Sequence, residues 1–137
     1  MIVNTLWGPE ETEFFKCIYC EKQKPISERV SQGTSGSKTR CKPCVSHHAK
    51  VVNKLKKENL SSKPIISDSC IICERTGNEL INTGAFNGNR GPWMLDHDHQ
   101  TEKFRGWICQ HCNNGLGGFR DNIKSLENAI KYLKQNR

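Results

Sequence analysis

The chain is poor in the apolar residues that hold most small domains together. Of its 137 residues only 34% are hydrophobic and 7% are aromatic, and a chain of this length buries a modest core. No apolar stretch approaches the roughly 20 residues that a membrane helix needs. The opening segment, MIVNTLWGPEETEFF, has neither a basic start nor a sustained apolar run. We therefore expect a soluble, intracellular protein with no membrane partner, whose fold depends on more than packing.

Cysteine is the residue that the chain has in excess. Eight cysteines form four C-x-x-C pairs, namely Cys17/Cys20, Cys41/Cys44, Cys70/Cys73 and Cys109/Cys112. Thiols stay reduced inside cells, so the fourfold repetition favours metal ligands over disulfides or redox motifs. Two such pairs close a tetrahedral S₄ site with no open position. The sequence therefore predicts two structural zinc ions, with sequential closure of the pairs preferred over an interleaved arrangement.

The net charge of the chain favours a polyanionic partner, but less strongly once the zinc sites are counted. The formal net charge is +7, but each S₄ zinc site carries −2, which leaves about +3. The basic residues gather on a stretch after the second cysteine pair, at Lys50, Lys54, Lys56 and Lys57. They are read either as a solvated helix face or as phosphate contacts, and the sequence does not decide between the two.

Two helices are predicted outside the cysteine pairs. Val45, Val52 and Leu55 share one helical face, and this helix should end near Ser61–Pro64 because proline disfavours a helical residue before it. Near the C-terminus Ile123, Leu126, Ile130 and Leu133 recur at helical spacing up to about residue 135, with Asn122 or Asp121 as the cap. The second helix is expected to pack on the core or to support a dimer. We divide the chain into an N-terminal zinc module with a basic linker helix, residues 1–62, and a second domain, residues 63–137.

The segment that precedes and includes the last cysteine pair has the order strand, turn, strand, helix. Trp93–Leu95 is an apolar strand, residues 100–103 are turn-like, and residues 104–108 form a second strand. A short helix then starts at Cys109, and we expect Gly115 and Gly117 to break it. Asp96, His97, Asp98 and His99 lie where the first strand meets the turn.

This junction predicts a metal-dependent hydrolase of phosphodiesters. Neighbouring residues of a regular strand face opposite sides, so Asp96 and His97 converge only where the strand ends. Asp96 and Asn113, whose helix is fixed by Cys112, would then supply two oxygen ligands, which suit Mg²⁺ with its retained waters. An unperturbed histidine has a pKa of about 6.5, which suits a general base, and this is the role that we expect of His97.

Two other interpretations stay open. His97 and His99 form an H-x-H pair, which holds a transition metal from one strand face and would make the site a zinc hydrolase. Alternatively, the charged residues are merely solvated and the chain is a non-catalytic, zinc-ribbon-type nucleic-acid-binding protein. His111, between two cysteines of one pair, is expected to face outward because four cysteines are available.

In these residues the sequence resembles the phage recombination endonuclease VII family of HNH, or His-Me finger (ββα-metal), nucleases. The matching core is L-D-H-D-H at Leu95–His99, then R-G-x-x-C-x-x-C-N-x-x-L-G at Arg105–Gly117. The upstream Cys70 and Cys73 complete the expected zinc site. The specific part of the resemblance covers about half of the chain, and the module of Cys17 to Cys44 is similar to zinc modules of some phage relatives.

The resemblance implies a small α+β fold, with a ββα-metal core, an N-terminal Cys₄ module and a C-terminal helix. It implies a DNA endonuclease with a catalytic Mg²⁺ or Mn²⁺ on Asp96 and Asn113, His97 as general base, and His99 positioning the scissile phosphate. The DNA would be held by its backbone with weak sequence specificity, in the cytoplasm of a bacterial host. The type member cuts branched DNA as an intertwined dimer with long C-terminal helices, which a single helix here does not match. Branched-DNA cleavage, nicking, double-strand cleavage and a homodimer therefore stay open.

Overall fold

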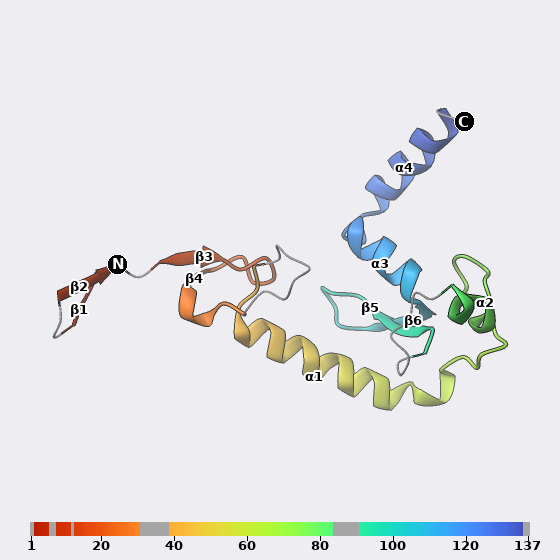
Figure 1. Ribbon diagram of the computed structural model, residues 1–137, viewed down its shortest axis with the longest axis horizontal. Helices are drawn as coiled ribbons and strands as arrows, with labels where there is room; N and C mark the ends of the chain where they lie inside the picture. The colour runs from red at the N-terminus through yellow and green to blue at the C-terminus, as the bar shows by residue number, and fades with distance from the viewer. Residues whose placement is uncertain (1, 6–7, 12, 31–38, 84–90, 136–137) are drawn as a thin grey trace. The chain divides into compact units, whose positions relative to one another are not determined.

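The computed structural model describes residues 2–5, 8–11, 13–30, 39–83 and 91–135. It divides into two compact units, Met1–Lys54 and Leu55–Arg137, which are described separately (Figure 1). The division falls inside a helix, α1 (Lys42–Glu58), whereas our domain boundary between residues 62 and 63 follows the end of that helix and stays a prediction. Within the described ranges no helix is both long and apolar enough to cross a membrane.

The first unit is built from two small hairpins and the start of a helix. Strand β1 (Ile2–Thr5) pairs antiparallel with β2 (Gly8–Glu11), and β3 (Phe14–Lys16) pairs antiparallel with β4 (Gln23–Pro25). A 3₁₀ turn, η1 (Ile26–Glu28), follows β4. The buried residues are Phe15, Cys17 and Cys41, with Cys20 and Cys44 packed against them. Four of these five side chains are thiols, so residues 13–30 and 39–54, whose side chains the structure describes, contribute almost no apolar core.

Helix α1 confirms the helix predicted between the second and third cysteine pairs. It ends at Glu58, and a 3₁₀ turn, η2 (Leu60–Ser62), precedes Pro64 as the proline rule requires. Leu55 is buried, whereas Lys50, Lys54, Lys56 and Lys57 are exposed. The basic side chains are therefore on the solvent side of the helix, accessible to an anionic partner.

The second unit contains the ββα arrangement that the sequence predicts. Its elements are α2 (Gly77–Asn82), β5 (Trp93–His97), β6 (Phe104–Cys109), α3 (Gln110–Gly118) and α4 (Ile123–Gln135). Strands β5 and β6 form an antiparallel hairpin, and α3 contacts both. Leu80, Trp93 and Ile108 are buried around Cys70 and Cys109, so a single core joins α2, the hairpin and the thiols.

The β5–β6 ladder has a β-bulge opposite Asp96 and His97. Asp96 pairs with Gly106, but His97 pairs with Phe104, so Arg105 is the extra residue of β6. A bulge bends its strand and redirects a side chain. Our expectation that the first strand ends at Leu95 is wrong: Asp96 and His97 both belong to β5, and the irregularity beside them comes from the partner strand.

Helix α3 also corrects the prediction. It runs unbroken through Gly115 and Gly117 to Gly118, although glycine costs about 1 kcal/mol per residue in a helix. Its first turn is fixed instead by the Cys109 sulfur, which accepts a hydrogen bond from the Cys112 N–H. The start of the helix is therefore fixed at Cys109, and the glycines that follow do not break it.

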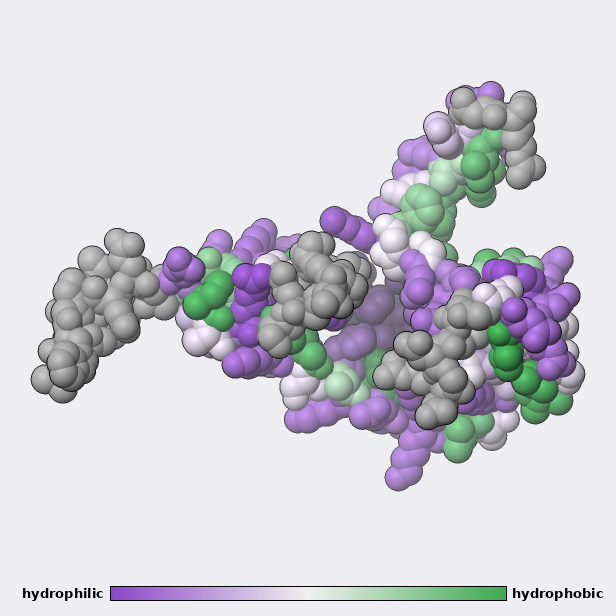
Figure 2. All heavy atoms as spheres, viewed as in Figure 1, coloured by the Kyte–Doolittle hydropathy of each residue, from purple (hydrophilic) through white to green (hydrophobic). Residues whose placement is uncertain are grey.

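Helix α4 begins where the sequence places it but does not pack as expected. The Asn122 side chain accepts the Ser125 N–H at 2.8 Å and caps the helix. No residue of α4 is buried, and Ile123, Ile130 and Leu133 are more than half exposed. Hydrophobic side chains gather along α4 in Figure 2. These apolar side chains therefore do not pack on the core of the single chain, and the dimer remains a prediction.

One turn geometry occurs three times among the residues that the structure describes. In each copy the first residue exchanges backbone hydrogen bonds with the fifth and sixth, as in Cys17–Lys22, Cys70–Arg75 and Asp98–Lys103, at 2.8–3.1 Å. The fifth residue is a glutamate with positive φ every time: Glu21 at 57°, Glu74 at 62° and Glu102 at 58°. The β5–β6 turn is thus built like the two cysteine turns, with Asp98 in the place of the first cysteine.

The positive φ at Glu74 gives a stability prediction. A residue with a side chain loses about 1 kcal/mol or more in this conformation, whereas glycine adopts it freely but gains entropy in the unfolded chain. We expect Glu74→Gly to stabilise the zinc-loaded protein by about 0.5–1 kcal/mol, seen as a higher midpoint of thermal unfolding. Glu127→Gly is the control, because in the interior of α4 glycine should lower helicity and give no gain. An unchanged or lower midpoint for Glu74→Gly would contradict the strain assigned to this turn.

Candidate zinc and catalytic sites

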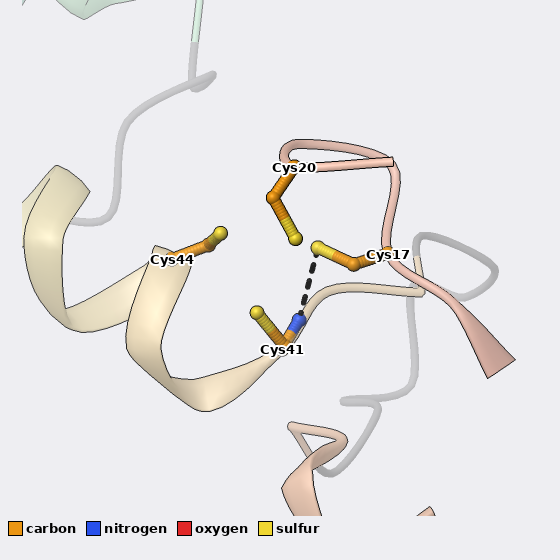
Figure 3. A group of neighbouring side chains, drawn as sticks. All are labelled: Cys17, Cys20, Cys41 and Cys44. Atoms are coloured by element: carbon orange, nitrogen blue, oxygen red, sulfur yellow. Dashed lines mark hydrogen bonds between the residues drawn. The ribbon is translucent and has the colours of Figure 1, made fainter. Parts of the chain in front are cut away.

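The first cysteine cluster joins the turn after β3 to the start of α1. Figure 3 shows the four sulfurs of Cys17, Cys20, Cys41 and Cys44 pointing toward one another. All four lie within 4.8 Å of each other, and the Cys41 N–H donates to the Cys17 sulfur at 3.4 Å. Hydrogen bonds of this kind stabilise negative charge on the sulfur. The donor set is that of a closed structural zinc site.

The second cluster has the same construction with a different set of elements. Cys70, Cys73, Cys109 and Cys112 also lie within 4.8 Å, and the Cys109 N–H donates to the Cys70 sulfur at 3.4 Å. The Cys73 and Cys109 sulfurs are 3.7 Å apart, close to the roughly 3.8 Å edge of a tetrahedron with 2.3 Å Zn–S bonds. Sequential pairing of the cysteine pairs is therefore confirmed, and the interleaved alternative is excluded.

The thiols within each cluster are electrostatically unequal. Burial raises the pKa of Cys17, but backbone N–H groups, of Cys20 and Cys41 above all, outweigh it and lower the pKa to about 6. Burial and the neighbouring sulfurs raise the pKa of Cys44 to about 12. The second cluster shows the same division, with the pKa of Cys73 lowered to about 6 and that of Cys112 raised. Four thiolates so close together repel, which a divalent cation would relieve.

Asp96 and His97 are the two charged or polar residues that the described core buries. Asp96 is 9% exposed and His97 is 6% exposed. Arg105, the extra residue of the bulge, donates from Nε to Asp96 Oδ2 at 2.8 Å and from Nη2 to Asp96 Oδ1 at 2.9 Å. This fork raises the pKa of the Arg105 guanidinium above its usual range, with a smaller contribution from Asp121. Burial of Asp96 is thus compensated by a bidentate partner, as a buried carboxylate requires.

The histidines of the motif lie together at the end of the hairpin. The His97 and His99 rings are 4.7 Å apart between centroids and tilted by 49°. His99 is more exposed than His97, and its Nε2 lies 3.9 Å from Asp121 Oδ2. An accessible imidazole beside a buried one would suit contact with a substrate that approaches from solvent.

Asp98 has a structural task in the turn. Its Oδ1 accepts the N–H groups of Gln100 at 2.9 Å and Thr101 at 2.7 Å. These two hydrogen bonds lower the pKa of Asp98, and the one from Thr101 contributes most. The Cys17 sulfur accepts the corresponding N–H groups in its own turn. The Asp98 side chain therefore stabilises this turn and, through it, the positions of the adjacent residues.

Asn113 lies on α3, one residue after the zinc-site cysteine Cys112. The helix contacts both β5 and β6, and Asn113 is half-buried while His111 is exposed, as expected. The carboxylate of Asp96 and the amide oxygen of Asn113 are hard donors that suit Mg²⁺ or Mn²⁺.

Two residues of this site were underestimated from the sequence. From the sequence Arg105 was the start of the R-G-x-x-C motif and Asp121 a candidate helix cap, but Arg105 Nη2 also donates to Asp121 Oδ2 at 3.0 Å. A lone arginine in an otherwise apolar strand, opposite a strand that carries an aspartate, was the available signal for the first pair. No sequence signal indicated the second, because it depends on the backbone between α3 and α4.

Comparison with known proteins places this geometry in a family. The family model described as recombination endonuclease VII matches residues 47–135. Two curated phage proteins are similar along most of their length. The Gene 59 protein of Mycobacterium phage D29 is 31% identical over 83% of this chain and 75% of its own, and the Gene 59 protein of Mycobacterium phage L5 is 30% identical over 82% and 74%.

A solved structure is similar as well. The ββα-Me type II restriction endonuclease Hpy99I is 29% identical, with a TM-score of 0.52 over 90% of this chain. The chain spans 66% of the length of that enzyme. The similarity confirms the small α+β fold with a ββα-Me core that the resemblance implied. The chain, with its zinc-type cysteine clusters and its L-D-H-D-H hairpin, belongs to the recombination endonuclease VII family.

Proposed function

We propose that this chain is a metal-dependent DNA endonuclease that hydrolyses phosphodiester bonds at the end of the β5–β6 hairpin. Membership of an endonuclease family and the similarity to a ββα-Me nuclease support the activity. The observation that carries the site is the burial of Asp96 and His97 side by side on β5, in a core otherwise made of apolar and thiol side chains. Burying polar side chains costs free energy, which Asp96 offsets through its bidentate Arg105 partner, and buried ionisable groups of this kind are concentrated at functional sites.

The residues divide the chemistry among them. Asp96 and Asn113 would hold one Mg²⁺ or Mn²⁺, which when bound stabilises the charge that develops on the phosphate and the leaving oxygen. His97 takes the proton of the attacking water as general base. His99, more exposed and beside it, positions the scissile phosphate. The bidentate fork of Arg105 keeps the Asp96 carboxylate in a single orientation.

The DNA is held through its backbone. Lys50, Lys54, Lys56 and Lys57 are exposed on one helix, and lysines supply point charges to phosphates without reading bases. We therefore expect binding that weakens steeply with salt and depends little on sequence. A phage origin, as in the curated relatives, would place the activity in the cytoplasm of a bacterial host.

One metal site cuts one strand in each engagement. Cleavage of both strands, or of a branched substrate, then requires two protomers or two events. The exposed apolar side chains of α4 support a homodimer as the source of the second site. Nicked and branched DNA are accordingly the substrates to compare with plain duplex.

A non-catalytic zinc-ribbon protein is the other candidate. It accounts for the two cysteine clusters and the basic helix, but it assigns no task to the buried His97. The endonuclease reading assigns one, and we adopt it.

The metal requirement tests the proposal. After mild EDTA treatment that leaves both zinc sites filled, we expect Mg²⁺ or Mn²⁺ to restore cleavage of nicked, branched or duplex DNA by at least a hundredfold over the metal-free rate. Hard oxygen donors are the reason. Measurement requires an end-labelled panel of these substrates with each metal titrated separately. The H-x-H site of His97 and His99 predicts rescue by Zn²⁺ instead, and the absence of cleavage with every metal would leave the binding-protein candidate.

A further inference from the structure

The segment between α3 and α4 contacts the β5–β6 hairpin through the carboxylate of Asp121. Arg120 and Asp121 both have positive φ, at 54° and 53°. Two consecutive non-glycine residues in this conformation are costly, by about 1 kcal/mol each, and persist where the surroundings determine them. The Asp121 N–H donates to the Leu116 carbonyl at 2.9 Å, which ties the turn to α3. Asp121 Oδ2 then lies 3.0 Å from Arg105 Nη2.

The guanidinium of Arg105 is shared by two carboxylates. Nε and Nη2 bind the two oxygens of Asp96, and Nη2 also binds Asp121. The planar fork therefore cannot rotate without losing one of its partners. Each carboxylate oxygen accepts about two hydrogen bonds or ligands, so the fork leaves a lone pair free on both oxygens of Asp96. Arginine and a cation can thus bind the same carboxylate at once.

The charges of these groups matter for a cation. Asp96 and Arg105 alone are neutral as a pair, and a divalent ion would then meet a carboxylate whose charge is already cancelled. Asp121 adds a second negative charge within the same network, which is half-buried at Arg105 and Asp121 and nearly fully buried at Asp96. The three groups together carry −1, which favours a cation over the neutral pair.

We infer that Asp121 is a positioning residue of the catalytic metal site, which holds Arg105 on Asp96 and restores the negative charge that Arg105 cancels. This inference rests on the proposed function and deepens it, because it concerns the same divalent ion. Asp121 acts through Arg105, and its other neighbour in the site is His99, whose Nε2 lies 3.9 Å from Asp121 Oδ2. Partners that orient a metal ligand in this way change metal affinity by about 10–100-fold.

Asp121→Asn removes the negative charge that faces Arg105 and His99. Asparagine is nearly isosteric with aspartate and tolerates positive φ, so the turn should keep its conformation. We expect the zinc-loaded full chain with this substitution to bind Mn²⁺ at least about tenfold more weakly, measured by the loss of the free-Mn²⁺ electron paramagnetic resonance signal. Cleavage should need correspondingly more Mn²⁺ but approach the wild-type rate at saturation.

Glu127→Gln is the matched control, because it removes the same charge from an exposed position of α4. It should bind Mn²⁺ as the wild type does. Arg105→Lys is the second variant: it keeps the charge but loses the fork, and we expect it also to weaken Mn²⁺ binding. This second variant tests the positioning even if Asp121→Asn does not fold.

The outcomes separate the inference from the proposed function. If the wild type binds Mn²⁺ and cuts DNA while Asp121→Asn binds Mn²⁺ equally well, the inference alone is overturned. Equal Mn²⁺ binding by wild type and Arg105→Lys would overturn it as well. If the wild type and Asp96→Ala bind Mn²⁺ equally, there is no metal at Asp96 and both fail.

Discussion

Replacing His97 by alanine should abolish DNA cleavage and leave DNA binding within about twofold of the wild type. The imidazole is the only group assigned to take the proton of the attacking water, and loss of a general base costs about 10²–10⁴-fold in rate. Binding depends instead on exposed basic side chains distant in sequence, such as Lys54. Single-turnover cleavage and a salt titration of binding measure the two effects separately.

The variant also discriminates between the two candidate functions. A non-catalytic zinc-ribbon protein would show no cleavage with either form. His97→Ala that cut DNA at nearly the wild-type rate would refute the assignment of the base. His111→Ala is the control, since this histidine is exposed on α3 beside the zinc cluster and has no assigned role.

Loss of the second zinc site should have the largest effect on the fold. Zinc binding by thiolates contributes on the order of 10 kcal/mol of folding free energy in small domains, and domains are stable by about 5–15 kcal/mol. Cys70 and Cys109 are part of the buried core of the second unit. We therefore expect Cys112→Ser to unfold the hairpin and α3 and to remove activity.

The first zinc site provides the comparison. Cys41→Ser should unfold residues 1 to about 45, weaken DNA binding and leave residual cleavage at high enzyme concentration, because its cluster lies in the other unit. Elemental analysis should find two zinc ions per chain in the wild type and about one in Cys41→Ser. One zinc or none in freshly purified, reduced wild type would contradict the two-site architecture. Collapse of the second unit in Cys41→Ser would contradict the independence of the clusters.

The sequence predicted those features that depend on spacing alone. Repeated C-x-x-C pairs determine the two clusters, because a tight turn directs both sulfurs to one point. The alternation and turn residues around Asp98 determine the hairpin. The sequence offered Asn122 or Asp121 as the α4 cap, and the structure has Asn122, whose side-chain oxygen accepts the Ser125 N–H. Each of these is a local property of a few consecutive residues.

The features that were missed depend on register and packing. The bulge at Arg105 depends on the register in which β6 pairs with β5. The two strand sequences are compatible with registers that differ by one residue, so they do not predict the bulge. Glycine propensity predicted a break in α3, but the Cys109 thiol fixes the first turn and the helix continues. The helical periodicity correctly predicted an apolar face on α4. Periodicity does not predict which surface packs against that face.

The three equivalent turns have a consequence for the order of folding. In the turn at Asp98 the closing acceptor is the carboxylate of the chain itself, bonded to neighbours two and three residues away. Such short-range contacts form in microseconds and need no ion. The two cysteine clusters instead join residues 24 and 36 positions apart along the chain, and their closure awaits zinc. We therefore expect the nascent chain to form the hairpin with Asp96 and His97 first, and to add the helix with Asn113 when the metal arrives, so that zinc supply limits how quickly a competent nuclease appears.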